Sequence, residues 1–349
     1  MTMNNLVITR QESAAIKGLL IFIIVLGHNY IFAERFVTCY DYLYTFHVAC
    51  FFILSFIYPP KRLSKSRVVD YFVRTYIPYI CFFLLLFLCN LILRTRGITL
   101  GRSEQIGEMS LIGALTSILN GGVDLLPTYT IFQYLWFLPA WFSFSVLKDL
   151  LHGGGKLLQS VLLILGFVCF CFMYVFMYFT PYPKSVNIII ESFSLFSVFQ
   201  GLAFLFLSWI TYKFITSYRN YVYVAILIFL ILTIWYFSDS SIKKIWFMRA
   251  VMPTLAFMIL FETKSLLAKI KLLTACGKYS FQIYLVQTPI CAAVYVVAKH
   301  FNLTDSFIAP LYSQVLIFVL SYFIGMLLTK IKLAKRLLSP KSLSDLLGK

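Results

Sequence analysis

Long runs of apolar residues, separated by short polar breaks, follow one another along almost the whole chain. A transmembrane helix needs roughly 20 predominantly apolar residues to cross about 30 Å of hydrocarbon. We therefore expect an all-α fold: a polytopic transmembrane helical bundle of about ten helices, forming a single domain over residues 1–349 with a basic tail at 331–349. The pattern predicts these helices near residues 14–33, 42–58, 71–93, 128–148, 157–180, 188–212, 219–237, 245–262, 278–298 and 307–330.

Composition supports the membrane as the solvent of this chain. Of 349 residues, 61% are hydrophobic and only 12% are charged, against about 25% charged in soluble domains. The formal net charge of +17 is high enough to raise nucleic-acid binding as a function. However, the basic residues sit in short clusters between apolar runs, not on one soluble face or arm. The composition thus predicts a protein in contact with membrane lipid and argues against a nucleic-acid partner.

Lys and Arg are spread unevenly over alternate polar breaks. If the N-terminus is inside, most of the 30 basic residues fall on the cytoplasmic side, including those of the break near 61–67 and of the tail. Short loops rich in Lys and Arg remain cytoplasmic. We therefore expect both termini to be cytoplasmic, which requires an even number of helices.

The first predicted helix carries two ionisable residues, which are costly at membrane depth and are functional candidates by default. Lys17 lies at its cytoplasmic end, and His28 follows eleven residues later. At 1.5 Å and about 100° per residue, the two lie about 16 Å apart along the axis and on nearly the same face. A lysine at the inner surface suits the phosphates of a nucleotide-containing donor, and a deeper imidazole suits removal of a proton from a hydroxyl. A snorkelling lysine and a packed histidine are the alternative.

A second histidine, His47, begins the second predicted helix. If this helix returns antiparallel, His47 approaches the depth of His28, which makes proton handling or a metal site conceivable. A metal is the weaker choice, because His152 and His300 fall in loops on opposite sides and no ligand spacing typical of zinc occurs. We therefore predict no metal.

Four further residues are candidates for substrate binding. Arg249 lies near the outer end of the eighth predicted helix, where it is placed to meet a substrate carboxylate or phosphate or to pair with Glu191. Gln287 is a buried polar candidate in the ninth helix. Trp136 belongs to the run Trp136-Phe137-Leu138-Pro139, in which we expect the proline to bend the fourth helix; plain packing or interface anchoring is the alternative role of the aromatic residues.

Four ordered segments resemble the acyltransferase-3 family, whose first helix has an Arg or Lys, ten intervening residues and then a His. Together they cover most of the chain, and each lies on a predicted helix. The segments are Ile16-Lys17-Gly18 through Val25-Leu26-Gly27-His28, Phe46-His47 leading to Phe51-Phe52 and Ser55, Leu135-Trp136-Phe137-Leu138-Pro139-Ala140, and Gly277-Lys278-Tyr279-Ser280 to Ile283-Tyr284-Leu285.

The resemblance implies an integral membrane O-acyltransferase of the bacterial cytoplasmic membrane. Such an enzyme takes an acyl group, usually acetyl, from cytoplasmic acetyl-CoA or another acyl-CoA and delivers it to a hydroxyl of a cell-surface polysaccharide or lipid-linked sugar. By this resemblance His28 is the catalytic base, Lys17 helps to hold the CoA and His47 is an auxiliary residue. The chain departs from the family pattern at Ala14, where many members are acidic, and at Gln287, where many have His.

Two other functions stay open at this point. A flippase or exporter of lipid-linked sugars explains the helices and basic loops equally well, but it gives no reason for the spacing of Lys17 and His28. Transporters also often show inverted repeats, and no repeat is evident in the sequence. A relative that kept the fold and lost catalysis is the second alternative. Only an acyltransferase consumes acetyl-CoA, and its need for a neutral imidazole predicts lower activity at mildly acid pH.

Overall fold

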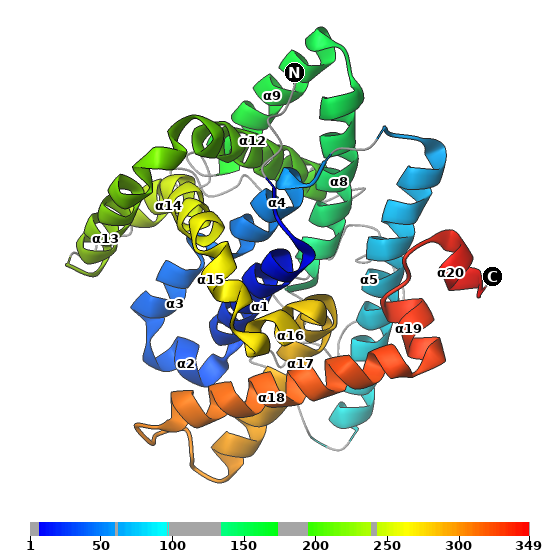
Figure 1. Ribbon diagram of the computed structural model, residues 1–349. Coiled ribbons are helices and arrows are strands. Elements are labelled where there is room, and N and C mark those ends of the chain that lie inside the picture. The colour runs from blue at the N-terminus through cyan, green and yellow to red at the C-terminus, as the bar shows by residue number, and fades with distance from the viewer. Residues whose placement is uncertain are drawn as a thin grey trace.

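The computed structural model describes residues 7–59, 62–95, 97, 134–173, 195–238 and 243–348, and every regular element among them is helical (Figure 1). Helical residues occur in the described part of each predicted range, with the range 14–33 divided between α1 and α2 and the range 42–58 divided between α3 and α4. The elements are α1 (Arg10–His28), α2 (Tyr30–Arg35), α3 (Val37–Leu43), α4 (His47–Ile57), α5 (Lys65–Arg94), η2 (Tyr134–Trp136), α8 (Phe137–Gly153), α9 (Lys156–Cys171), α12 (Leu195–Tyr218), η5 (Arg219–Tyr221), α13 (Val222–Ser238), α14 (Lys243–Glu262), α15 (Lys264–Ala268), α16 (Lys271–Lys278), α17 (Ser280–His300), α18 (Ala309–Lys330), α19 (Lys332–Leu338) and α20 (Leu343–Leu347).

Within the described part of the chain, six helical segments are long and apolar enough to cross a membrane. They are Arg10–His28, Val37–Ile57, Lys65–Arg94, Ser197–Tyr218, Ser280–His300 and Ala309–Lys330. Two shorter apolar helices, α9 and α13, expose large hydrophobic side chains along their length. Large apolar surface that no protein covers is typical of helices that face lipid. The fold is therefore an all-α membrane protein.

The first predicted membrane helix, 14–33, is interrupted in the structure. α1 ends at His28, and Asn29 adopts an extended conformation between α1 and α2. The Asn29 side chain accepts a hydrogen bond from Phe32 N at 3.4 Å and donates one to Ser313 Oγ of α18 at 2.9 Å. Because Asn29 caps the next helix and binds a distant one, the chain turns there and His28 becomes the last residue of α1.

Two hydrophobic clusters form the interior. One draws mainly on α4, α8, α12 and α14, and the other mainly on α1, α5 and α17. α1 lies between them, with Ile16 and Leu20 in the first cluster and Ile21 and Ile24 in the second. Burial on both sides fixes the rotation of α1 and hence the directions of its polar side chains.

α1 and α16 cross with their backbones in direct contact. A methyl group built on Gly277 would lie 1.6 Å from the Ala14 carbonyl oxygen, and one on Gly18 would lie 1.9 Å from the Leu273 carbonyl oxygen. Only glycine permits so close an approach. α15 and α16, which the hydrophobic pattern did not separate from a loop, thus form part of the packing around α1.

The predicted tail is folded against the bundle. α19 and α20 lie beside α5 (Figure 1). Asp70 accepts a hydrogen bond from Leu343 N at 3.4 Å, and Gln282 of α17 donates one to Ser339 Oγ at 3.0 Å. The basic residues at this end therefore belong to a docked pair of short helices.

Candidate functional site

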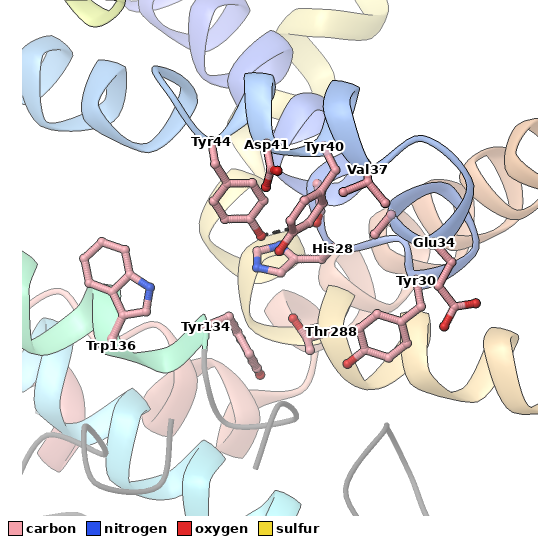
Figure 2. Close-up of a pocket in the computed structure, with 12 residues that line it drawn as sticks. His28, Tyr30, Glu34, Val37, Tyr40, Asp41, Tyr44, Tyr134, Trp136 and Thr288 are labelled. Atoms are coloured by element: carbon pink, nitrogen blue, oxygen red, sulfur yellow. Dashed lines mark hydrogen bonds between the residues drawn. The ribbon is translucent and has the colours of Figure 1, made fainter. Parts of the chain in front are cut away.

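A cavity of about 490 Å³ opens at the end of α1, and we call it the His28 cavity (Figure 2). It lies where α1, α2, α3, η2 and α17 meet. Its described lining consists of Gly27, His28, Tyr30, Ala33, Glu34, Val37, Tyr40, Asp41, Tyr44, Tyr134, Trp136 and Thr288. The turn at Asn29 creates this cavity, because it folds α2 and α3 back over the last residue of α1.

The His28 imidazole is held through one ring nitrogen. Its Nδ1 lies 3.0 Å from the Ile24 carbonyl oxygen and 3.0 Å from the side-chain amide of Gln287, which also lies 2.9 Å from Thr288 Oγ1. A carbonyl can only accept, so the Ile24 contact places the hydrogen on Nδ1. Rotating the Gln287 amide by a half turn about its last bond presents its oxygen, otherwise without a described partner, to that hydrogen. Nε2, which no described hydrogen bond uses, then carries the lone pair at the cavity.

Tyr44 links the two histidines. Its ring centroid is 6.2 Å from that of His28 and 4.7 Å from that of His47, both in edge-on geometry. Its hydroxyl donates to the Gly27 carbonyl at 3.2 Å, and Gly27 leaves room for the ring. His47 itself is fully buried, with Nδ1 hydrogen-bonded to the Leu43 carbonyl. Tyr44 thus lies beside both His28 and His47, and His47 is outside the described cavity lining.

Two carboxylates face the same cavity. Glu34 lies on α2 and Asp41 on α3, and Figure 2 shows them on the side of the cavity formed by these helices. The Tyr295 hydroxyl donates to Glu34 Oε1 at 3.0 Å. Arg249 of α14 acts electrostatically on both Asp41 and His47, although it is not among the described lining residues. Arg249 therefore supports the site from outside the cavity.

Lys17 opens into a different cavity. This Lys17 cavity has a volume of about 220 Å³ and a mainly apolar lining, and no described residue forms a hydrogen bond or an ion pair with the Lys17 ammonium. Its described lining consists of Lys17, Ile21, Ile24, Phe51, Phe137, Leu138, Trp141, Ser280, Phe281 and Tyr284. Lys17 is therefore the cationic side chain in the described lining of this mainly apolar cavity.

A layer of aromatic side chains lies between the two cavities. Trp136 lines the His28 cavity and Phe137 lines the Lys17 cavity, with ring centroids 6.3 Å apart. Tyr134 and Tyr284 are paired in the same way, at 5.5 Å, and the Tyr134 hydroxyl donates to the Leu285 carbonyl at 2.7 Å. One helix, α1, thus carries a cation and an imidazole into two cavities that share a thin wall.

The structure brings together most, but not all, of the residues singled out from the sequence. His28, Trp136 and Gln287 lie at the His28 cavity, with Gln287 behind the imidazole. Glu191 lies outside the described residues.

Sequence reasoning missed Glu34, Asp41 and Tyr44. Their signal was present: a tyrosine-rich stretch with two acids directly follows the histidine that ends the first helix.

Among the described residues, no three His, Cys, Asp or Glu side chains gather in an arrangement that would hold a metal ion. All eight cysteines are free thiols.

Comparison with known proteins identifies the class of the chain. The family model Acyl_transf_3, described as an acyltransferase domain, matches residues 12–330. No curated protein and no solved structure matches the chain significantly. The matched range includes α1 with Lys17 and His28, both walls of the His28 cavity, and α18. This chain is a member of the acyltransferase-3 family, a membrane acyltransferase.

Proposed function

We propose that this protein is an O-acetyltransferase that moves an acetyl group from acetyl-CoA on the cytoplasmic side to a hydroxyl of a cell-surface polysaccharide or lipid-linked sugar. One observation carries the proposal: a single helix presents Lys17 to one cavity and His28 to another. A reaction between two substrates that approach from opposite sides of a membrane needs two such openings. A bacterial cytoplasmic membrane is the location that fits this pair of substrates.

The Lys17 cavity suits the donor. A lysine ammonium attracts phosphate groups as a point charge, and an apolar, aromatic lining suits an uncharged thioester arm. Lys17 and His28 lie about 16 Å apart along α1. The flexible arm of CoA is the part of the donor that is thin enough to pass the wall between the cavities. Phe137 and Tyr284 would then move aside while the thioester reaches His28.

The His28 cavity suits the chemistry. In the proposed step, His28 Nε2 removes the proton from a sugar hydroxyl while the oxygen attacks the thioester carbonyl. The tetrahedral intermediate then collapses, the carbon–sulfur bond breaks, and the imidazolium returns its proton to the departing CoA thiolate. The products are an acetyl ester and CoA, so His28 ends as it began.

Gln287 and the Ile24 carbonyl are the residues that orient this base. Both contact Nδ1, which keeps the hydrogen on that nitrogen and the lone pair on Nε2. In this proposal Gln287 is a positioning residue, because the described contacts place it against the imidazole and not in the cavity lining. The same pair of contacts would fix the ring plane during proton transfer.

The test is transfer of label from radioactive acetyl-CoA to glycan in membranes that carry equal amounts of wild type or His28→Ala. The matched control is His300→Ala, because His300 is exposed at the end of α17, away from both cavities. We expect ester-linked label with wild type and with His300→Ala, and at least about a hundred-fold less with His28→Ala.

Two outcomes would contradict the proposal. Full transfer by a normally expressed His28→Ala protein would remove His28 as the base. No label with any protein across a broad glycan panel, together with movement of an unmodified lipid-linked sugar, would instead favour the flippase, which consumes no acetyl-CoA.

A further inference from the structure

A smaller cavity adjoins the His28 cavity at Glu34. It has a volume of about 290 Å³, and its described lining consists of Ile31, Glu34, Arg35, Thr304 and Asp305. Because Glu34 lines both cavities, the two meet at this residue. Together they extend away from the imidazole along α2 toward the segment that connects α17 and α18. A substrate unit at His28 therefore has room for a neighbouring unit beyond Glu34.

The segment that forms the far side of the smaller cavity is tied to α2. The Arg35 guanidinium donates to the backbone carbonyls of Asp305 and Ser306 and lies over the Phe307 ring at 5.7 Å. The Tyr312 hydroxyl donates to the Leu303 carbonyl at 2.8 Å. The described hydrogen bonds of Arg35 thus go to backbone carbonyls of the protein. The carboxylates of Glu34 and Asp305 are among the groups that line the smaller cavity.

The charged side chains that line the His28 cavity are acidic, whereas the smaller cavity includes Arg35 beside Glu34 and Asp305. Among the described lining residues of the His28 cavity, Glu34 and Asp41 are the charged side chains, and neither Lys nor Arg occurs. Carboxylates accept hydrogen bonds from hydroxyl groups but repel anions at this range. The carboxylates in the lining present acceptor oxygens to a bound ligand. The cavities therefore favour ligands that donate hydroxyl hydrogens and carry no negative charge.

Aromatic rings supply the other part of the lining. Tyr30, Tyr40, Tyr44, Tyr134 and Trp136 surround the space in front of His28 (Figure 2). Such rings offer flat apolar faces, and their hydroxyl and indole groups offer polar edges. A sugar ring, with apolar C–H faces and hydroxyls at its rim, matches both features. A lipid phosphate or an acidic sugar does not.

We propose that the acceptor is a glycan without negative charge and of at least two sugar units, selected by carboxylates: one unit in the His28 cavity against Glu34 and Asp41, and the next in the smaller cavity against Asp305. This inference rests on the proposed function, because it assigns the same site a narrower acceptor. Glu34, at the junction, contacts both units. Three observations support it: Glu34 lines both cavities, carboxylates line each of them, and aromatic rings surround the space in front of His28.

Binding without donor separates this inference from the transfer reaction. The purified full-length protein in detergent is dialysed to equilibrium, without acetyl-CoA, against tritiated probes. The neutral probes are trisaccharides of glucose, mannose and galactose and the methyl glycosides of the corresponding single sugars. The charged probes are trigalacturonic acid and a glucosamine trisaccharide. We expect at least one neutral trisaccharide to bind about ten-fold more tightly than its methyl glycoside and than the acidic probe.

Three variants and one control locate the selection. Glu34→Gln and Asp41→Asn keep the shape of each side chain, and each should weaken the neutral trisaccharide about ten-fold while reducing the preference over the acidic probe. Asp305→Ala should weaken the trisaccharide several-fold without changing the methyl glycoside. Asp345→Asn, in the docked tail, is the matched control and should bind as wild type does. A purely structural effect would weaken all probes equally.

Each result decides the inference. Tighter binding of trigalacturonic acid than of the neutral and glucosamine trisaccharides would overturn the selection against negative charge, and equal binding of methyl glycoside and trisaccharide would overturn the second unit. Failure of every probe to bind would overturn both. Selective binding of a neutral trisaccharide without transfer of label would leave this inference standing while the proposed function fails.

Discussion

The two cavities served by α1 differ in nearly every physical property. The His28 cavity is about 490 Å³ and contains two carboxylates and several tyrosines, whereas the Lys17 cavity is about 220 Å³, mainly apolar, and contains one cation. They nevertheless share a wall, because Trp136 and Phe137 are consecutive residues that face opposite sides. Under the proposed function, the contrast corresponds to one site per substrate: a polar cavity for the hydroxyl-bearing acceptor and an apolar cavity for the thioester arm.

This division separates the kinetic roles of the two ends of α1. Groups in the His28 cavity should control the chemical step and the acceptor, and groups in the Lys17 cavity should control the donor. A variant in one cavity that alters the kinetics of only one substrate supports this division of roles. A variant that alters the kinetics of both substrates equally contradicts it.

The largest effect is expected for His28→Gln. This change keeps a polar side chain but removes the base, so kcat should fall by about 10²- to 10⁴-fold. Binding of acetyl-CoA, measured by equilibrium dialysis, should stay as in wild type, because His28 is not among the described residues of the Lys17 cavity. Loss of acetyl-CoA binding in a folded His28→Gln protein would mean that the cavities do not divide the substrates.

The next effect is expected for Lys17→Met, which keeps the length of the side chain and removes its charge. The KM for acetyl-CoA should rise about ten-fold or more, with little change in the KM for the acceptor, because a hydrogen-bonded charge contributes about 1.5–3 kcal/mol. Lys17→Arg should restore most of the loss. Lys271→Met, at an exposed position on α16, is the control. A rise in the KM for the acceptor instead would show that Lys17 acts on the acceptor and not on the donor.

A smaller effect is expected for Gln287→Leu. Without the amide, Nδ1 of His28 keeps only the Ile24 carbonyl as a described partner, and kcat should fall about ten-fold while both KM values stay near wild type. Gln287→His, which again offers a polar nitrogen near Nδ1, should recover activity. The measurement is steady-state kinetics with each substrate varied in turn. A rise in the acceptor KM alone would show that Gln287 binds substrate directly.

The smallest effect on catalysis, but a clear one on stability, is expected for Gly277→Ala. The added methyl would overlap the Ala14 carbonyl, so α1 and α16 must separate, at a cost of about 1–3 kcal/mol. Thermal unfolding in detergent should begin several degrees lower than for wild type. Gly153→Ala is the control, since no atom lies within 4 Å of the added methyl. Equal melting temperatures for the two variants would show that the helices are not in contact.

Much of this arrangement could be predicted from the sequence. The 3.6-residue period of a helix was enough to place Lys17 and His28 on one face at two depths, and the apolar runs were enough to predict an all-α membrane protein. Local information determines both features. The family match to residues 12–330 agrees with the four segments that suggested it.

The acceptor side could not be predicted in the same way. Tyr30, Ile31 and Phe32 continue the apolar run of the first helix, so the predicted helix passed through Asn29. The turn there depends on Ser313, which is 284 residues away in the sequence and meets Asn29 only in the folded protein. Without that turn, Glu34 and Asp41 would belong to a connecting loop with no cavity to face. Tertiary contacts, not local pattern, created this half of the site.

The turn at Asn29 also makes the acceptor side modular. Most of the described wall of the His28 cavity comes from one continuous stretch, residues 27–44, whereas the Lys17 cavity draws on α1, α4, α8 and α17. A change within that stretch can alter which glycan fits without touching the lysine or its pocket. Under the proposed function, the fit of the sugar unit at His28 can therefore change through a single short segment while the residues around Lys17 stay the same.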